Sequence, residues 1–98
     1  MSNHIITTAI NNRQCLSCTY DGQSRIIEPH AYGINSQNHE VIRAWQNAGG
    51  SNSNSPAETP RLWVVSKMQS LQLSNKTFTP RERYTRGDKG MSIIYAQI

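Results

Sequence analysis

The pattern of apolar and polar positions predicts one short helix followed by several strands. Four apolar residues near the N-terminus fall on one face of a helix: Ile5, Ile6, Ala9 and Ile10. Asn3 is suited to cap the first turn, so we expect a helix over Asn3–Asn12. A helix of this length is not stable in isolation and has to pack on the rest of the fold.

A hairpin follows the predicted helix and organises the first two strands. The strands Cys15–Tyr20 and Ser24–Glu28 flank Asp21-Gly22, a pair typical of a type I′ turn because both turn positions need positive φ. Pro29 has no N–H to donate, so it belongs at an edge, a bend or a bulge. We therefore expect a sharply bent second strand.

Three further strands are separated by polar connections. After a turn over Asn35–Asn38, they are predicted at His39–Gln46, Arg61–Val65 and Ser70–Leu73. The segment Asn47–Pro60 is rich in Gly, Ser, Asn and Pro and has no apolar pattern. We interpret it as a long loop that is either functional or a mobile linker.

Together these elements predict an α+β, mainly β fold. A short N-terminal helix and five bent antiparallel strands, over about residues 3–78, are typical of a small Sm-like or SH3-like barrel. Residues 79–98 are then a basic C-terminal extension of the same fold. The chain of 98 residues, 1–98, is expected to form a single domain.

The end of the chain has two segments of different character. Lys76–Gly90 carries five basic residues against two acidic ones, with Phe78 and Tyr84 between them, which suits a phosphate backbone. Met91–Ile98 is apolar enough to require burial, as an extra strand, as a docked helix, or as an arm on a second copy. The last alternative predicts a homodimer built through Met91–Ile98.

Composition and charge indicate the kind of partner. The formal net charge of +4 and the isoelectric point near 9.4 favour anionic partners. No apolar run approaches membrane length, and the N-terminus lacks the layout of a signal peptide. We therefore expect a cytoplasmic protein without membrane contact.

The chemistry-bearing residues argue against an enzyme. Cys15 and Cys18 form a lone Cys-x-x-Cys, without the helix of a redox motif or the second ligand pair of a zinc site. On a strand they point to opposite faces, so we interpret them as ordinary half-buried thiols. No set of nucleophile, base and orienting group is evident. The expectation is a non-catalytic protein with no cofactor and no metal.

Three stretches in register resemble the WYL domain, a small Sm-like regulatory module of bacterial and phage proteins. They are Ala9–Tyr20, Arg25-Ile-Ile-Glu-Pro29 and Arg61–Leu73. They are similar, in this order, to the family's Ala-Ile helix with a Tyr-ended strand, its Arg-x-Val-x-Pro, and its Arg-x-Phe-x-Leu-x-Arg-Ile with a last strand. The resemblance covers roughly residues 5 to 78.

The chain also departs from the family pattern. The triplet that names the family falls on Glu40-Val41-Ile42, so that its Trp and Tyr are absent. Lys67 stands where the fourth-strand motif usually ends in Arg, and Val64 stands where a basic residue is often found. The departures concern the ligand more than the fold.

The resemblance implies a stand-alone regulatory module that binds a nucleotide or single-stranded nucleic acid through a basic and aromatic face. Independently of it, Arg and Lys suit phosphates, and aromatic rings suit bases. The candidate ligand-binding residues are Tyr20, Arg25, His30, Tyr32, Arg43, Trp45, Arg61, Trp63 and Lys67. Each of these residues also has an alternative role without a ligand. The two Trp could pack in the core, Arg25 and Arg61 could flank strands in solvent, and His30 could be a surface residue.

A second function of a different class is a protein-interaction module. In this reading the chain is a phage or mobile-element accessory protein, and its apolar end and long loop contact a protein partner. The salt dependence of binding distinguishes the two hypotheses, because affinity for a polyanion falls steeply with added salt.

Overall fold

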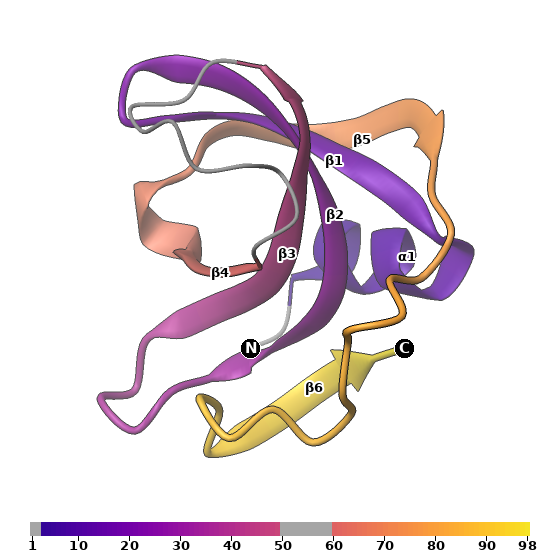
Figure 1. The fold of residues 1–98 in the computed structure, drawn as a ribbon. Coiled ribbons are helices and arrows are strands. Elements are labelled where there is room, and N and C mark those ends of the chain that lie inside the picture. The colour runs from indigo at the N-terminus through magenta and orange to yellow at the C-terminus, as the bar shows by residue number, and fades with distance from the viewer. Residues whose placement is uncertain (1–2, 50–59) are drawn as a thin grey trace.

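The computed structural model describes residues 3–49 and 60–98 of the chain. These residues form a single α-helix, α1 (His4–Asn12), followed by six strands (Figure 1). The strands are β1 (Gln14–Tyr20), β2 (Gln23–Ile34), β3 (Glu40–Gly49), β4 (Arg61–Val64), β5 (Gln69–Thr77) and β6 (Ile93–Gln97), with a single 3₁₀ turn, η1 (Val65–Lys67), between β4 and β5. The mainly β fold with a short N-terminal helix is confirmed.

The helix begins where the sequence predicts. The Asn3 side chain accepts hydrogen bonds from the N–H groups of Ile5 and Ile6, at 2.9 and 3.3 Å. The apolar stripe packs on the sheet and buries Ile6, Ala9 and Ile10 completely. Packing of this stripe, rather than intrinsic propensity, therefore holds a helix of nine residues.

The predicted hairpin is confirmed in its geometry. Asp21 and Gly22 have φ of 53° and 76°, the left-handed values that a type I′ turn requires. Tyr20 and Gln23 pair directly across the turn, and the register continues to Leu16 opposite Ile27.

The long strand β2 is the centre of the sheet, whose order is β4-β3-β2-β1-β5. One edge of β2 pairs with β3, while the other edge has two successive partners. Residues 23–27 pair with β1, and residues 31–34 pair with β6. Pro29 lies where the partner changes, next to a break in register between Pro29 and Ala31, as expected of a residue that cannot donate to a ladder.

The predicted closed barrel of five strands needs two corrections. The sheet has six strands, because the last apolar segment forms β6 against β2 of its own chain. No ladder joins β4 to β5 within the described residues, so the sheet is not closed. Of the three alternatives for Met91–Ile98, the extra strand is the one observed: residues 93–97 pair with β2, while Ile93 remains 55% exposed.

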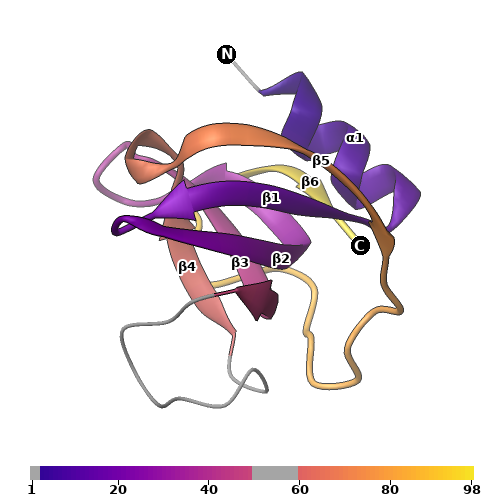
Figure 2. The ribbon, with the colours of Figure 1, turned by 90° about the horizontal axis from the view of Figure 1, so that it is seen from above.

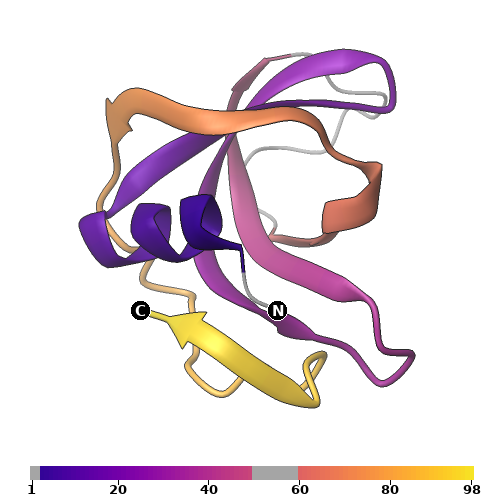
Figure 3. The same ribbon diagram turned by 180° about the vertical axis from the view of Figure 1, so that it is seen from behind.

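The sheet is covered on both faces. α1 packs on one face together with Leu16, Ile27, Ile42 and Trp63, which form the main core. Seen from behind, α1 lies between β5 and β6 (Figure 3).

Residues 78–92, which we call the strap, cross the opposite face (Figure 2). There Met91 and Tyr84 pack with Ala31 and Val41 in a second, smaller cluster.

Among the described residues, no helix is long and apolar enough to span a membrane; α1 has nine residues.

Replacement of Gly33 by Ala is expected to detach β6. A Cβ at Gly33 would overlap the backbone carbonyl of Ile93, so the two strands could not keep their register. We expect Gly33→Ala to lower the free energy of unfolding by about 1–3 kcal/mol, as other forced overpacking does. The exposed Ser24 on the same strand provides the control: Ser24→Ala should change urea stability by less than ~0.5 kcal/mol. An unchanged stability of the Gly33 variant would contradict the close approach of the two strands.

Candidate functional site

The first anchor of the strap is a carboxylate buried in the sheet. The Arg81 guanidinium donates to both oxygens of Glu28, at 2.7 and 3.2 Å. The Asn47 side-chain amide donates a third hydrogen bond to the same carboxylate, at 2.7 Å. Glu28 is almost completely buried, whereas Arg81 is partly exposed. The carboxylate end of this ion pair is therefore shielded from water.

The second anchor point is His30, which is fully buried. Its Nδ1 lies 2.9 Å from the carbonyl oxygen of Glu28, and its Nε2 accepts from the N–H of Arg81 at 3.0 Å. This pair of contacts fits only a neutral ring with its proton on Nδ1. The rings of Trp45, Phe78 and Tyr84 surround it at centroid distances of 4.5, 5.0 and 5.1 Å.

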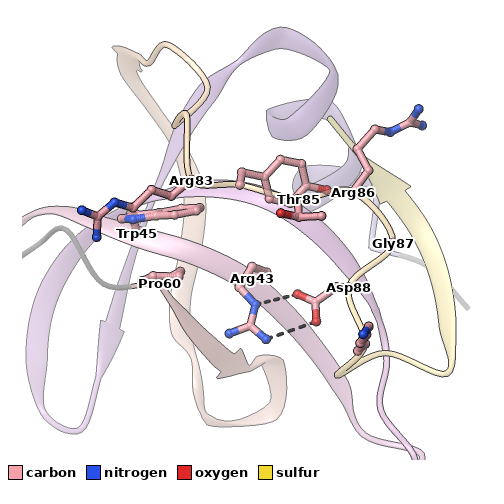
Figure 4. Close-up of a pocket in the computed structure, with 10 residues that line it drawn as sticks. Arg43, Trp45, Pro60, Arg83, Thr85, Arg86, Gly87 and Asp88 are labelled. Carbon is pink, nitrogen blue, oxygen red and sulfur yellow. Dashed lines mark hydrogen bonds and ion pairs between the residues drawn. The ribbon is translucent and has the colours of Figure 1, made fainter.

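The third anchor lies at the other end of the strap. Arg43 donates from Nε and Nη2 to the two oxygens of Asp88, at 2.5 and 3.1 Å (Figure 4). The hydrogen bond from Arg43 holds the pKa of Asp88 below its usual value, although burial acts in the opposite direction. Asp88 also accepts from the N–H of Gly90 at 2.8 Å, which fixes the carboxylate in its turn.

Between these anchors the strap and β3 enclose a pocket of about 430 Å³. Its wall combines one tryptophan, one proline, four cationic side chains and one carboxylate (Figure 4). The lining residues are Arg43, Trp45, Pro60, Arg83, Tyr84, Thr85, Arg86, Gly87, Asp88 and Lys89. A second pocket of about 360 Å³ shares Trp45 and Arg83 with it.

The charges around this pocket do not cancel. Asp88 is its single carboxylate, and Arg43 already neutralises it. Three further cations, Arg83, Arg86 and Lys89, are exposed, and none forms an ion pair within residues 3–49 and 60–98. The pocket therefore presents an excess of positive charge to solvent, which attracts anions.

Four of the nine residues predicted from the sequence form a separate cluster around Trp63. Arg25 and Arg61 lie over the Trp63 ring, with guanidinium carbons 5.4 and 5.7 Å from the ring centroid. The Tyr20 ring meets the same indole edge-on at 5.0 Å. Arg61 and Trp63 lie on the same face of β4, and Trp63 itself is buried, as the packing interpretation predicts.

The two clusters lie on opposite faces of the sheet. Trp63 and Arg61 pair with Ile42 and Ala44 on β3, so their side chains point to the core face. Arg43 and Trp45 alternate with those β3 residues and point to the strap. The sequence-predicted residues are thus divided between two places and do not form one surface.

Two more of the predicted residues belong to neither cluster. Tyr32 is fully buried, and its hydroxyl donates to Glu40 and accepts from the N–H of Asn3 at 2.8 Å. Burial and the hydrogen bond with Glu40 raise the pKa of Tyr32 well above its usual value. Lys67 is exposed in η1 and does not line the pocket beside the strap.

Two exposure assignments from the sequence are wrong. His30 is not a surface histidine, because the strap and three aromatic rings cover it. Arg25 is only 1% exposed, because Tyr20 and Trp63 enclose its guanidinium. Arg25 donates to the carbonyl of Tyr20 and to the side chain of Gln46, at 3.2 and 3.4 Å, while its Nη2 has no hydrogen-bond partner among the described residues.

The two cysteines fit the expected structural role. They lie on opposite faces of β1, both buried and both free. Burial is the main cause that raises the pKa of each thiol, which lowers its reactivity. Residues 3–49 and 60–98 contain no group of three or more His, Cys, Asp or Glu side chains arranged to hold a metal ion.

Sequence reasoning included Arg43 and Trp45 among the candidate residues, and both line the pocket. It did not include Arg83, Arg86, Asp88 or Lys89 among the site residues. The basic character of Lys76–Gly90 was the available indication, but only the fold shows that this segment crosses β3. The long loop predicted at Asn47–Pro60 lies largely outside the described residues.

Comparison of this chain with protein-family models, curated proteins and solved structures found no match in any of the three. The assignment of a function therefore depends on the site itself.

Acidification is expected to loosen the strap through His30. Burial is the main cause that lowers the pKa of His30 below its usual 6.5, and the neighbouring Arg81 and Arg13 add to it, while the carbonyl and carboxylate of Glu28 oppose it. The unfolded chain then binds a proton more readily than the folded one, so stability falls as the pH drops below about 6.5.

Urea unfolding at pH 7.5 and pH 5.5 measures this effect. The unmodified protein should be less stable at pH 5.5, whereas His30→Gln, whose side-chain oxygen also accepts a hydrogen bond, should lose less stability between the two pH values. An equal loss in both proteins would show that His30 does not carry the pH dependence.

Arg25 is expected to act through packing. Arg25→Ala leaves a cavity between two rings and should cost about 2–4 kcal/mol. Arg25→Met keeps the volume and removes a buried charge that has no carboxylate partner within the described residues, so its stability should lie within about 1 kcal/mol of the unmodified protein. An equal loss in the two variants would instead assign the stabilisation to the guanidinium itself.

Proposed function

We propose that this protein is a non-catalytic module that binds a phosphorylated ligand, a nucleotide or a single strand of nucleic acid, in the pocket between the strap and β3. The observation that carries the proposal is the excess of unpaired cations at this pocket. Arg83, Arg86 and Lys89 surround it without carboxylate partners among the described residues, and Arg43 with Asp88 closes one side. Phosphate groups are the biological anions that such clusters of Arg and Lys bind most often.

The dimensions of the pocket suit a ligand of this class. Small-molecule sites commonly have volumes of ~300–1,000 Å³, and the pocket here measures about 430 Å³. Two of its cations are arginines of the strap, and guanidinium groups bind phosphate oxygens in pairs.

Aromatic stacking contributes little to this proposal. Trp45 and Trp63 are each only 1% exposed, and the other five aromatic residues are buried or half-buried. A nucleic-acid base therefore finds no exposed ring plane of the kind that single-strand binding proteins use. We infer that recognition depends on the phosphate groups.

The proposal extends to the fold family. The sheet order β4-β3-β2-β1-β5, with β4 and β5 linked by a single 3₁₀ turn, is consistent with an Sm-like or SH3-like barrel that is open between its end strands. We propose that the chain is a WYL-like domain on the strength of this order and of the three motif stretches. The resemblance implies the same class of ligand as the pocket does.

The test measures binding of a dT decamer with a 5′-phosphate and a 3′-fluorescein by fluorescence anisotropy. The double variant Arg86→Ala/Lys89→Ala removes two exposed cations of the pocket and should weaken binding by about tenfold or more. The slope of log K against log salt should become shallower by about 0.7 for each lost phosphate contact. Stability should change by less than ~0.5 kcal/mol for each exposed substitution.

A matched control removes the same charge elsewhere. Lys67→Ala/Lys76→Ala takes two exposed cations from η1 and β5, outside the pocket. It should retain most of the affinity. Equal weakening by both double variants would show that binding follows net charge, and affinity that does not change with salt would favour a protein partner instead.

A further inference from the structure

Three cations of the strap follow one another at intervals of three residues. Arg83, Arg86 and Lys89 all line the pocket, all are exposed, and none forms an ion pair with the described residues. Figure 4 shows the side chains of Arg83 and Arg86 extending from the strap in opposite directions, on either side of Thr85. Both side chains would have to turn around to meet at a single phosphate. As they lie, the two guanidinium groups suit two separate phosphates.

The backbone that carries these cations is held before and after them. The N–H of Arg81 donates to His30, and Asp88 is bound by Arg43. Between these points the Tyr84 ring packs on the His30 ring, with 5.1 Å between the centroids. Because the strap is fixed at these three places, its cations are kept apart and little backbone freedom is lost when a ligand binds.

The carboxylates of the strap set the limits of this row of cations. Asp88 is neutralised by Arg43, so it does not oppose an anion in the pocket. Glu82 is exposed and lines the neighbouring pocket, which shares Arg83 with the first one. Its carboxylate repels phosphate, so the row ends at Arg83 on this side. The stretch from Arg83 to Lys89 therefore offers one cation to each of three phosphates.

The same surface offers little to the base of a nucleotide. Trp45 lines the pocket but is only 1% exposed, and the Tyr84 ring is half-buried against His30. The groups within reach are cations, and cations contact the phosphates of a strand rather than its base edges. Contacts of this kind carry no sequence information.

We propose that the strap binds a chain of consecutive phosphates, with Arg83 and Arg86 on different phosphates, and that it does not recognise the bases. The inference rests on the proposed function and deepens it, because it selects a strand over a single nucleotide. The shared chemistry is a chain of phosphates, which either a single strand of nucleic acid or inorganic polyphosphate provides.

The experiment measures the salt dependence with which a dT decamer binds, with a 5′-hydroxyl and a 3′-fluorescein. The slope of log K against log salt counts the phosphates in contact and does not depend on how many positions the decamer offers. Three contacts should give a slope of about −2, whereas a site for one phosphate gives about −0.7.

Two further ligands separate phosphates from bases. The dinucleotide TpT has a single phosphodiester and should compete at concentrations about fiftyfold higher or more, because loss of two contacts adds to the about tenfold that the number of phosphates explains. A decamer of abasic units with the same number of phosphates should bind within about threefold of the dT decamer.

Single variants test the two arginines separately. Arg83→Ala and Arg86→Ala should each weaken binding of the dT decamer by about threefold or more and make the slope shallower by about 0.7, and the double variant should combine both effects. Lys76→Ala is the matched control, since it removes an exposed cation of β5 outside the pocket. It should keep the slope of the unmodified protein. All these positions are exposed, so the urea midpoints should not change.

Each result decides the matter. A slope near −0.7, or TpT within about tenfold of the decamer, shows that one phosphate suffices and overturns the inference, while the proposed function survives. A loss of more than about tenfold with the abasic decamer overturns it as well, because the bases then contribute. Equal slopes in the arginine variants and in Lys76→Ala place the contacts elsewhere and also overturn it. Failure of the decamer to bind removes the proposed function and this inference together.

Inorganic polyphosphate of about ten units, used as a competitor, separates the two sources of the chain. Displacement of the decamer at a similar or lower concentration indicates a site for phosphate chains in general. Much weaker displacement indicates a strand of nucleic acid. Either result supports contact with several phosphates.

Discussion

The arrangement of the whole protein depends on the three residues at which β2 changes its partner. Pro29 has no N–H, so the ladder is interrupted beside it: the pairing of β2 with β1 stops at Ile27, and the pairing with β6 starts at Ala31. The residues on either side of Pro29, Glu28 and His30, form hydrogen bonds with the strap. Glu28 binds the Arg81 side chain and His30 accepts from the Arg81 backbone, so the break in the sheet becomes the attachment point of the strap.

Two ion pairs also connect the strap to the sheet. The two ion pairs between strap and sheet run in opposite directions, since the strap provides the cation at one end and the carboxylate at the other. Such an alternation favours one direction of the strap, because a reversed segment would bring like charges together. Arg83 and Arg86, between these anchors, form no ion pair with the described residues, and both are exposed to solvent.

Much of the fold follows from local sequence. The capping Asn3, the Asp21-Gly22 turn and the strand period of residues 39–46 act over a few positions, and each one appears as expected. Interactions between distant segments could not be predicted in this way. The burial of His30 and the division of Arg25 from Arg43 depend on which face each strand turns to its neighbour, and the place of Arg83 depends on a strap that no local pattern specifies.

The pairing of residues 31–34 with residues 93–97 has a consequence for how the molecule assembles. Contacts between strands that follow one another in the chain close shorter loops, whereas this pairing, like that of β1 with β5, joins segments far apart in the sequence and carries a larger loss of chain entropy. The helix, the hairpin and β3 can therefore associate before the last strand docks. The pocket beside the strap is then a late product of folding, and a molecule with a nearly complete core still lacks it until the last strand docks.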